Sequence, residues 1–236
     1  MNQPQLIVAL DTDSFKDAQN IVTRLKDSVH IYKVGSQLFT ACGRDIMDFL
    51  MNQEKKIFLD LKFHDIPHTV ANAVKSAILL TEDRNALMML TLHTIGGLEM
   101  LQAAVQSAKE TVKNLKCQRP LLVGVTVLTS DAKADNIHSL ILERAQLAKD
   151  AGLDGVVASA QEAVMIREKF GKDFVIVTPG IRPEGHEAQD QKRVTTPAQA
   201  VANGSHFLVV GRPILQAPDP LQATQEILKE MSGDSR

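Results

Sequence analysis

Short apolar or β-branched runs alternate with amphipathic stretches along the whole chain, and this alternation limits the possible folds more than any other feature. Strands are predicted at residues 6–11, 31–35, 57–62, 87–93, 121–128, 155–158, 174–178 and 207–211. Consecutive β-α units form parallel strands joined by right-handed crossovers, in a doubly wound sheet or in a closed barrel. Eight units in 236 residues fit closure better, so we predict an α/β fold in which residues 1–236 form a single (β/α)8 TIM barrel domain.

The predicted helices begin and end at residues that favour helix termini. Ser14 opens the first helix, Thr196 the seventh and Asp219 the last, and a proline follows each of the latter two. A left-handed glycine often follows a helix. The glycines in such positions are Gly152, Gly171 and Gly204. Because no linker, low-complexity tract or sequence repeat interrupts this pattern, we expect no domain boundary.

The composition excludes several classes of function. With 26 basic and 28 acidic residues the formal net charge is -2, which gives no general positive field for nucleic acid or for an anionic membrane. The apolar run near the amino terminus is too short for a signal or membrane helix, so we expect a cytoplasmic protein. Cys42 and Cys117 lie far apart and lack partners at metal-ligand spacing, so we expect free thiols.

The third predicted strand ends in charged residues. Asp60 and Lys62 are separated by one residue, so a regular strand places them on the same face at its carboxyl end, and Asp65 follows in the turn. An ammonium between carboxylates stays charged, which favours a proton donor over a Schiff-base nucleophile. The alternative is an ion pair that only closes the end of the strand, because short motifs also occur by chance.

Polar side chains also lie at the ends of other strands, and in a barrel these ends meet on the face that carries the chemistry. Asp11 ends strand one, Lys33 lies within the short strand two, His93 ends strand four and Thr129 follows strand five. Two alternatives stay open: Asp11 caps the first helix, or His93 is a hydrogen-bonded interior residue, which is the role we favour for it.

Two similar segments follow strands seven and eight, and both contain a glycine and an arginine. They are Pro179-Gly180-Ile181-Arg182-Pro183 and Val209-Val210-Gly211-Arg212-Pro213. Barrels commonly bind phosphate at this point through glycine N–H groups, a helix amino terminus and a guanidinium group. We therefore predict a monophosphate ligand, with two solvated surface arginines as the alternative. The polar segment 182–193 has the length of a functional lid.

His64 and His68 have the spacing that places two imidazoles one helical turn apart, as in some metal sites. Lys62 argues against such a site, because its ammonium would lie where a divalent ion would bind. We therefore predict no metal and expect at least one of these histidines to cover the loop.

Several of these segments make the chain resemble the orotidine 5'-phosphate decarboxylase family over nearly its whole length. The most specific is Phe58-Leu59-Asp60-Leu61-Lys62-Phe63-His64-Asp65-Ile66-Pro67, with Thr69-Val70 close behind. The others, in order, are Tyr32-Lys33-Val34-Gly35, Val125-Thr126-Val127-Leu128-Thr129-Ser130, Thr178-Pro179-Gly180-Ile181-Arg182-Pro183, Asp190-Gln191 and Val210-Gly211-Arg212-Pro213. The resemblance implies a carboxy-lyase that needs no cofactor and converts orotidine 5'-monophosphate to uridine 5'-monophosphate and carbon dioxide, in de novo pyrimidine biosynthesis.

The resemblance also implies a role for each matching residue. Lys62 donates a proton to C6 of the pyrimidine, and Asp60 lies against the departing carboxylate. Asp65 comes from the second subunit of a homodimer and, with Asp60, keeps the lysine charged and oriented. The implied substrate-binding residues are Asp11, Lys33 and Thr69 of the partner subunit at the ribose, Thr129 at the base, and Arg182, Gln191, Gly211 and Arg212 at the 5'-phosphate.

Two rival functions stay open at this point. Related barrels share the D-x-K-x-x-D pattern but act on sugar phosphates with magnesium, as keto-gulonate-phosphate decarboxylases or hexulose-phosphate synthases do. These resemble the chain at strand three but carry a carboxylate at the end of strand two, where this chain has Lys33. The other rival is a noncatalytic barrel that binds a phosphate ligand, which would not need the charged residues of strand three.

Overall fold

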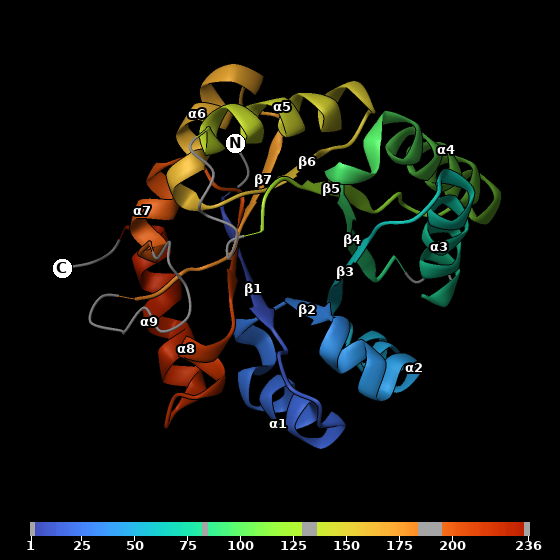
Figure 1. The fold of residues 1–236 in the computed structure, drawn as a ribbon. Coiled ribbons are helices and arrows are strands. Elements are labelled where there is room, and N and C mark those ends of the chain that lie inside the picture. The colour runs from blue at the N-terminus through green and yellow to red at the C-terminus, as the bar shows by residue number, and fades with distance from the viewer. Residues whose placement is uncertain (1–2, 82–84, 129–135, 184–194, 234–236) are drawn as a thin grey trace.

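In the computed structural model, which describes residues 3–81, 85–128, 136–183 and 195–233, parallel strands form a closed barrel in chain order from β1 to β8 (Figure 1). The strands are β1 Gln5–Ala9, β2 Ile31–Gly35, β3 Lys56–Phe63, β4 Leu87–His93, β5 Leu121–Val125, β6 Gly155–Val157, β7 Val175–Thr178 and β8 Phe207–Val210. Each strand pairs with the next, and β8 pairs with β1. The predicted (β/α)8 barrel is confirmed.

Helices follow the strands and surround the barrel (Figure 1). They are α1 Phe15–Leu25, α2 Ser36–Asn52, α3 Pro67–Leu80, α4 Gly97–Leu115, α5 Ile137–Asp150, α6 Ala160–Phe170, α7 Pro197–Ala202, α8 Arg212–Leu215 and α9 Pro220–Ser232, with short 3-10 turns η1 Lys26–Ser28 and η2 Thr94–Gly96. In the described part of the chain, none of these helices is long and apolar enough to cross a membrane.

The predicted helix starts are confirmed by their capping hydrogen bonds. Ser14 Oγ accepts from the backbone N–H of residue 17 at 3.2 Å, and Thr196 Oγ1 accepts from that of residue 199 at 3.2 Å. Asp219 Oδ1 accepts from two N–H groups in the first turn of α9, at 3.0 and 3.2 Å. Each cap satisfies donors that the first helical turn leaves unpaired. The glycines predicted after helix ends, Gly152, Gly171 and Gly204, all have positive φ.

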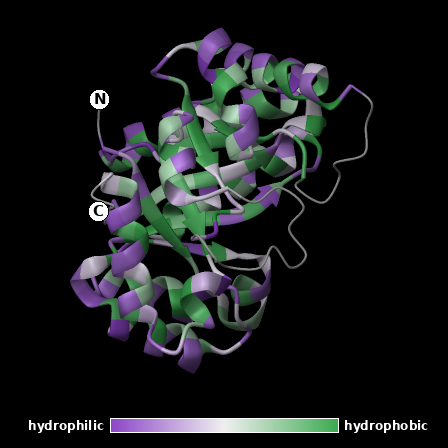
Figure 2. Ribbon diagram, turned by 90° about the vertical axis from the view of Figure 1, so that its left-hand side faces the viewer, coloured by the Kyte–Doolittle hydropathy of each residue, from purple (hydrophilic) through white to green (hydrophobic). Residues whose placement is uncertain are grey.

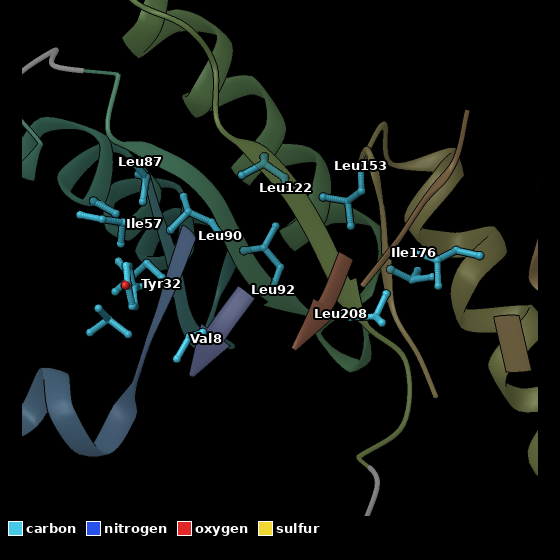
Figure 3. Packing of buried hydrophobic residues seen from close by; sticks show 14 of the residues in the cluster. Val8, Tyr32, Ile57, Leu87, Leu90, Leu92, Leu122, Leu153, Ile176 and Leu208 are labelled. Atoms are coloured by element: carbon cyan, nitrogen blue, oxygen red, sulfur yellow. The ribbon is translucent and has the colours of Figure 1, made fainter. Parts of the chain in front are cut away.

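The alternation of side chains along each strand separates two hydrophobic cores. Residues such as Ile7, Phe58 and Val209 point inward and fill the barrel interior. Their strand neighbours, such as Val8 and Leu208, point outward and pack against the helices (Figure 3). Figure 2 accordingly shows largely hydrophobic strands at the centre and helices that carry both hydrophilic and hydrophobic residues. A parallel sheet covered on both faces needs such nearly continuous apolar strands.

Four strands end earlier than predicted, β6 and β8 by one residue, β1 by two and β5 by three. We expected strand one to reach Asp11, but β1 ends at Ala9, because the N–H of Thr12 turns back to the carbonyl of Leu10 at 3.0 Å. We expected strand five to reach residue 128, but β5 ends at residue 125. Beyond it, the carbonyl of Thr126 accepts from Arg144 of α5, while the Thr126 N–H lies at the long distance of 3.5 Å from Val157 O of β6. The early end of β1 puts Asp11 in a loop above the barrel.

Candidate active site

Four charged side chains of alternating sign form a row at the carboxyl ends of β1, β2 and β3. Lys33 Nζ lies 2.8 Å from Asp11 Oδ1 and 3.7 Å from Asp60 Oδ2, while Lys62 Nζ lies 2.9 Å from Asp60 Oδ1. The side chains of Lys33 and Asp60 are only 12% and 13% exposed. Because opposite charges attract more strongly where water is excluded, the attraction is least screened at the centre of the row, whereas Asp11 and Lys62 at its ends are 51% and 37% exposed.

The end of β3 is not a regular strand, contrary to the prediction from side-chain alternation. Lys62 has a left-handed backbone with φ 51°, and the pairing of β3 with β4 changes register between Leu59 and Phe63. Lys62 still meets Asp60, but a bulge rather than a simple pleat brings them together. The backbone N–H of Lys62 donates to Thr91 Oγ1 of β4 at 2.8 Å. A non-glycine residue with positive φ is uncommon, and such strain tends to occur at functional sites.

Two glycines leave room for this row of charges. A Cβ at Gly35 would lie 3.0 Å from Lys33 Nζ, and a Cβ at Gly211 would lie 3.2 Å from Asp11 Oδ2. Both distances are shorter than an ordinary van der Waals contact, so any larger residue would displace one of the two charged groups. Gly211 thus connects the row of charges to the start of α8.

The segments after β7 and β8 supply the arginines of the site. Arg182 is 5% exposed, and its Nη1 donates to the carbonyl of Ile181 at 2.9 Å. A backbone hydrogen bond from Arg182 N–H to Thr195 O, at 3.0 Å, anchors the same turn. Gly180 permits the turn because its φ is 81°. Arg212 begins α8, directly after the glycine that lies beside Asp11.

The row of charges and the arginines line one cavity of about 220 Å³ at the top of the barrel. Its floor is apolar and comes from inward-facing strand residues such as Phe58, Val125 and Val177. The cavity therefore combines a charged wall, an apolar floor and a guanidinium side. This arrangement suits a planar polar ring joined to an anionic group.

Comparison with known proteins identifies the family. Residues 4–227 match the model of the Orotidine 5'-phosphate decarboxylase / HUMPS family. The chain belongs to this family. The orotidine 5'-phosphate decarboxylase of Syntrophotalea carbinolica is 44% identical, and the alignment covers 97% of this chain and 95% of that protein. That of Vibrio cholerae is 46% identical, with 96% and 98% covered. The crystal structure of the enzyme from Lactobacillus acidophilus has a TM-score of 0.82 at 36% identity, covering 98% of this chain and 99% of that one.

Within this member of the family, the cavity brings together most of the site residues predicted from the sequence. Those that line it are Asp11, Lys33, Asp60, Lys62, Arg182, Gly211 and Arg212. Thr129, Gln191 and nearly all of the predicted lid at 182–193 lie outside the described residues. Asp65 and Thr69 are exposed and lie outside the cavity, and Asp65 Oδ1 accepts from the N–H of Ile66 at 2.6 Å.

His64 and His68, next to the site, contact different residues rather than each other. His64 lies against His93, with ring centroids 5.7 Å apart, whereas the ring of His68 contacts Asn72 Nδ2 at 3.2 Å. His93 is half-buried, and its Nδ1 accepts from the N–H of Ile95 at 3.4 Å, so the interior role favoured for it stays a prediction. Burial lowers the pKa of His93, and the positive charges near it lower that pKa further.

Sequence reasoning missed one residue of the site, Thr91. It lies in β4 with no exposed surface, and its hydroxyl donates to Asp60 Oδ1 at 3.0 Å. The signal was a single hydroxyl inside the apolar run Met88-Met89-Leu90-Thr91-Leu92. Threonine is common in strands, so the run alone did not distinguish this residue from an ordinary strand residue.

Proposed function

We propose that this protein converts orotidine 5'-monophosphate to uridine 5'-monophosphate and carbon dioxide without a cofactor. The observation that carries the proposal is the alternating row of Asp11, Lys33, Asp60 and Lys62 beside a guanidinium-lined cavity, in a chain of this family. Names of the relatives support the reaction, and the charges of the site support the way it is catalysed.

Lys62 is the proton donor in this proposal. Loss of carbon dioxide leaves an electron pair on C6 of the pyrimidine, for which the ring offers no obvious sink. The Lys62 ammonium, held 2.9 Å from Asp60 Oδ1, stabilises that developing charge and then delivers its proton to C6. Because the ammonium is positioned before the reaction begins, little reorganisation accompanies the change in charge. The C6–carboxylate bond breaks and the C6–H bond forms, so the reaction needs no oxidant or reductant.

Asp60 lies against the substrate carboxylate. Its side chain is shielded from water, so repulsion between the two carboxylates is weakly screened and is relieved as carbon dioxide leaves. Asp60 also orients both lysines, with Lys33 on Oδ2 and Lys62 on Oδ1. Asp11 and Lys33, the other two members of the charged row, bind the ribose hydroxyls.

The 5'-phosphate binds beyond Asp11, at the carboxyl ends of β7 and β8. Arg182 and Arg212 supply guanidinium groups, and Gly211 supplies a backbone N–H. The family resemblance adds an amide contact from Gln191 and a contact of Thr129 with the base. The phosphate is remote from C6, so its binding energy can close the 182–193 segment over the substrate and organise the site. Removing the phosphate from the substrate therefore reduces kcat as well as affinity.

A homodimer completes the site, with Asp65 and Thr69 reaching the neighbouring subunit. Both side chains are exposed, Asp65 in the loop after β3 and Thr69 in the first turn of α3. Large apolar residues with unusual exposure occur after the ends of β3 and β4, namely Ile66 at 66% before α3, Ile95 at 57% in η2 and Leu98 at 40% in α4. A cluster of exposed apolar side chains beside a site is typical of a protein–protein interface.

The magnesium-dependent alternative is disfavoured by the position of Lys33. Its ammonium lies between Asp11 and Asp60, the two carboxylates that a divalent ion would bridge. Magnesium requires oxygen ligands in octahedral geometry, and an ammonium at the centre of the carboxylates would repel it. The charged row likewise argues against a noncatalytic phosphate-binding barrel, which would bury these charges without use.

The test is the ultraviolet change from orotidine 5'-monophosphate to uridine 5'-monophosphate with chelator-treated protein. Wild type is expected to convert the substrate, and Lys62→Ala to bind uridine 5'-monophosphate without turnover. Arg212→Ala is the matched control, which mainly weakens binding because it removes a phosphate contact. Equal turnover by wild type and Lys62→Ala would refute the mechanism, and activity restored only by magnesium would favour the sugar-phosphate reaction.

Mixed dimers test the shared site. Lys62→Ala and Asp65→Ala chains each form defective homodimers, but a mixed dimer has one site with both native residues. Unfolding and refolding an equal mixture should therefore restore about a quarter of the wild-type activity, since half of the dimers are mixed and each has one intact site. If the activity of the refolded mixture does not exceed the mean activity of the Lys62→Ala and Asp65→Ala homodimers, Asp65 acts within its own chain.

A further inference from the structure

Thr91 lies opposite the irregular end of β3. Leu59 pairs with Leu90 and Phe63 pairs with Leu92, so residues 60–62 of β3 face the single residue Thr91 of β4. Such an excess of residues on one strand makes a bulge that redirects side chains. The bulge contains the two charged residues of the proposed chemistry, and Thr91 is fully buried beneath them.

The Thr91 hydroxyl joins the backbone of Lys62 to the side chain of Asp60. Its oxygen accepts from Lys62 N–H at 2.8 Å, so its own hydrogen is left to donate to Asp60 Oδ1 at 3.0 Å. The same Oδ1 accepts from Lys62 Nζ at 2.9 Å. The three hydrogen bonds close a ring that runs from the Lys62 backbone through Thr91 and Asp60 to the Lys62 ammonium.

We propose that Thr91 is a positioning residue that fixes the Lys62 ammonium and the Asp60 carboxylate in their reactive arrangement. Lys62 adopts a left-handed backbone that a lysine disfavours, and the hydrogen bond from its N–H to Thr91 maintains that conformation. The hydroxyl also selects the Asp60 oxygen that receives the ammonium, which leaves Oδ2 to Lys33. This inference rests on the proposed function, because it assigns Thr91 to the same reaction.

Packing alone does not explain a threonine here. The neighbours of Thr91 along β4 are Leu90 and Leu92, both fully buried, and valine would fill the same volume without a polar group. A buried hydroxyl destabilises the fold unless it is hydrogen-bonded, and both partners of this hydroxyl belong to the proposed catalytic pair.

Thr91→Val removes the hydroxyl at nearly constant shape and is the main variant. The kcat for orotidine 5'-monophosphate should fall about 10- to 100-fold, the range expected when a reacting group is misplaced. The Kd for uridine 5'-monophosphate should stay near wild type, because the phosphate contacts lie across the cavity. Thr91→Ser keeps the hydroxyl and should restore most of kcat. Thr224→Val is the matched control, since Thr224 is also fully buried and its hydroxyl donates to Pro220 O in α9 at 2.8 Å.

Amide hydrogen exchange at Lys62, followed by NMR, tests the contact independently of activity. Exchange should be slow in wild type and Thr91→Ser and faster in Thr91→Val, or in Thr91→Ala if the valine variant does not fold. Wild type that leaves orotidine 5'-monophosphate unchanged would refute the proposed function, whereas fast exchange at Lys62 in wild type would refute the contact with Thr91. If wild type is active, either of two results would overturn the positioning role of Thr91. One is a kcat of Thr91→Val equal to that of wild type, and the other is an equal loss of kcat in Thr91→Val and Thr91→Ser.

Discussion

Arg167 connects helix α6 to the segments before β7 and before β8, at the end of the barrel opposite the cavity. Its removal gives a sharp prediction about stability. Its Nη1 donates to the carbonyls of Gly171 and Phe174 at 2.6 and 3.0 Å, and its Nη2 donates to the carbonyl of Gly204 at 2.6 Å. Nη2 also lies 3.0 Å from His206 Nδ1. One side chain on α6 thus holds the chain just before β7 and just before β8.

Arg167→Leu leaves these acceptors without their donor. Hydrogen bonds to a charged group contribute about 1.5–3 kcal/mol each, but the bonds of one guanidinium are not additive and water reaches part of this half-buried site. We therefore expect a loss of about 3 kcal/mol in the free energy of unfolding, roughly what two of these bonds contribute. For a domain of this size, that loss lowers Tm by about 6–12 °C.

Thermal melts and urea titrations of three variants measure this loss. Arg24→Leu is the matched control, because Arg24 lies 3.9 Å from Asp219 and the two side chains are 51% and 59% exposed, so removing this ion pair should cost less than about 1 kcal/mol. Arg167→Lys should fall between wild type and Arg167→Leu, since one ammonium cannot reach all the acceptors. If Arg167→Leu melts within about 2 °C of Arg24→Leu, less than 1 kcal/mol apart, the reasoning is refuted.

Three further changes are expected to act on stability. Tyr32→Phe should raise Tm by about 2–4 °C, because the buried Tyr32 hydroxyl has no hydrogen-bond partner among the described residues; a lower Tm would contradict this. Gly155→Ala should lower stability by about 1–3 kcal/mol, because its Cβ would overlap the Val175 carbonyl; an unchanged urea midpoint would show that the strands can separate there. Burial, and then the positive charge of Arg167, lower the pKa of His206 from its ordinary value of 6.5. Below that value the unfolded chain binds more protons than the folded one, so the free energy of unfolding decreases as the pH is lowered. The urea midpoint should therefore decrease from about pH 7.5 to about pH 5.5, and should decrease less in His206→Gln.

The fold could be predicted from the sequence because its signals are local. Each strand is a short apolar run, and the chain-order closure follows from eight units of the same type. The site was also largely predictable, because parallel strands bring residues such as Asp11, Lys62 and Arg212 to one end however far apart they lie in the chain. Strand ends were less predictable, since the residue after β5 hydrogen-bonds with Arg144, a residue in the next helix.

The bulge at Lys62 could not be predicted from the sequence. Alternation assumes a regular strand, and the departure from it depends on the hydroxyl of Thr91, 29 positions away along the chain. The partner of Asp65 stays a prediction, since the hydrogen bond of its side chain in the described residues is to its own loop. Both cases depend on contacts that no local pattern contains.

The pairing of β1 with β8 has a consequence for synthesis on the ribosome. β1 is made first, but one of its two neighbours follows about 200 residues later, which at about 5–20 residues per second means a delay of about 10–40 s. During that time β1 has an unpaired edge, open to pairing with other nascent chains. The last strand therefore protects the first, and a ribosome that stalls before residue 207 leaves an aggregation-prone product although most of the barrel has been made.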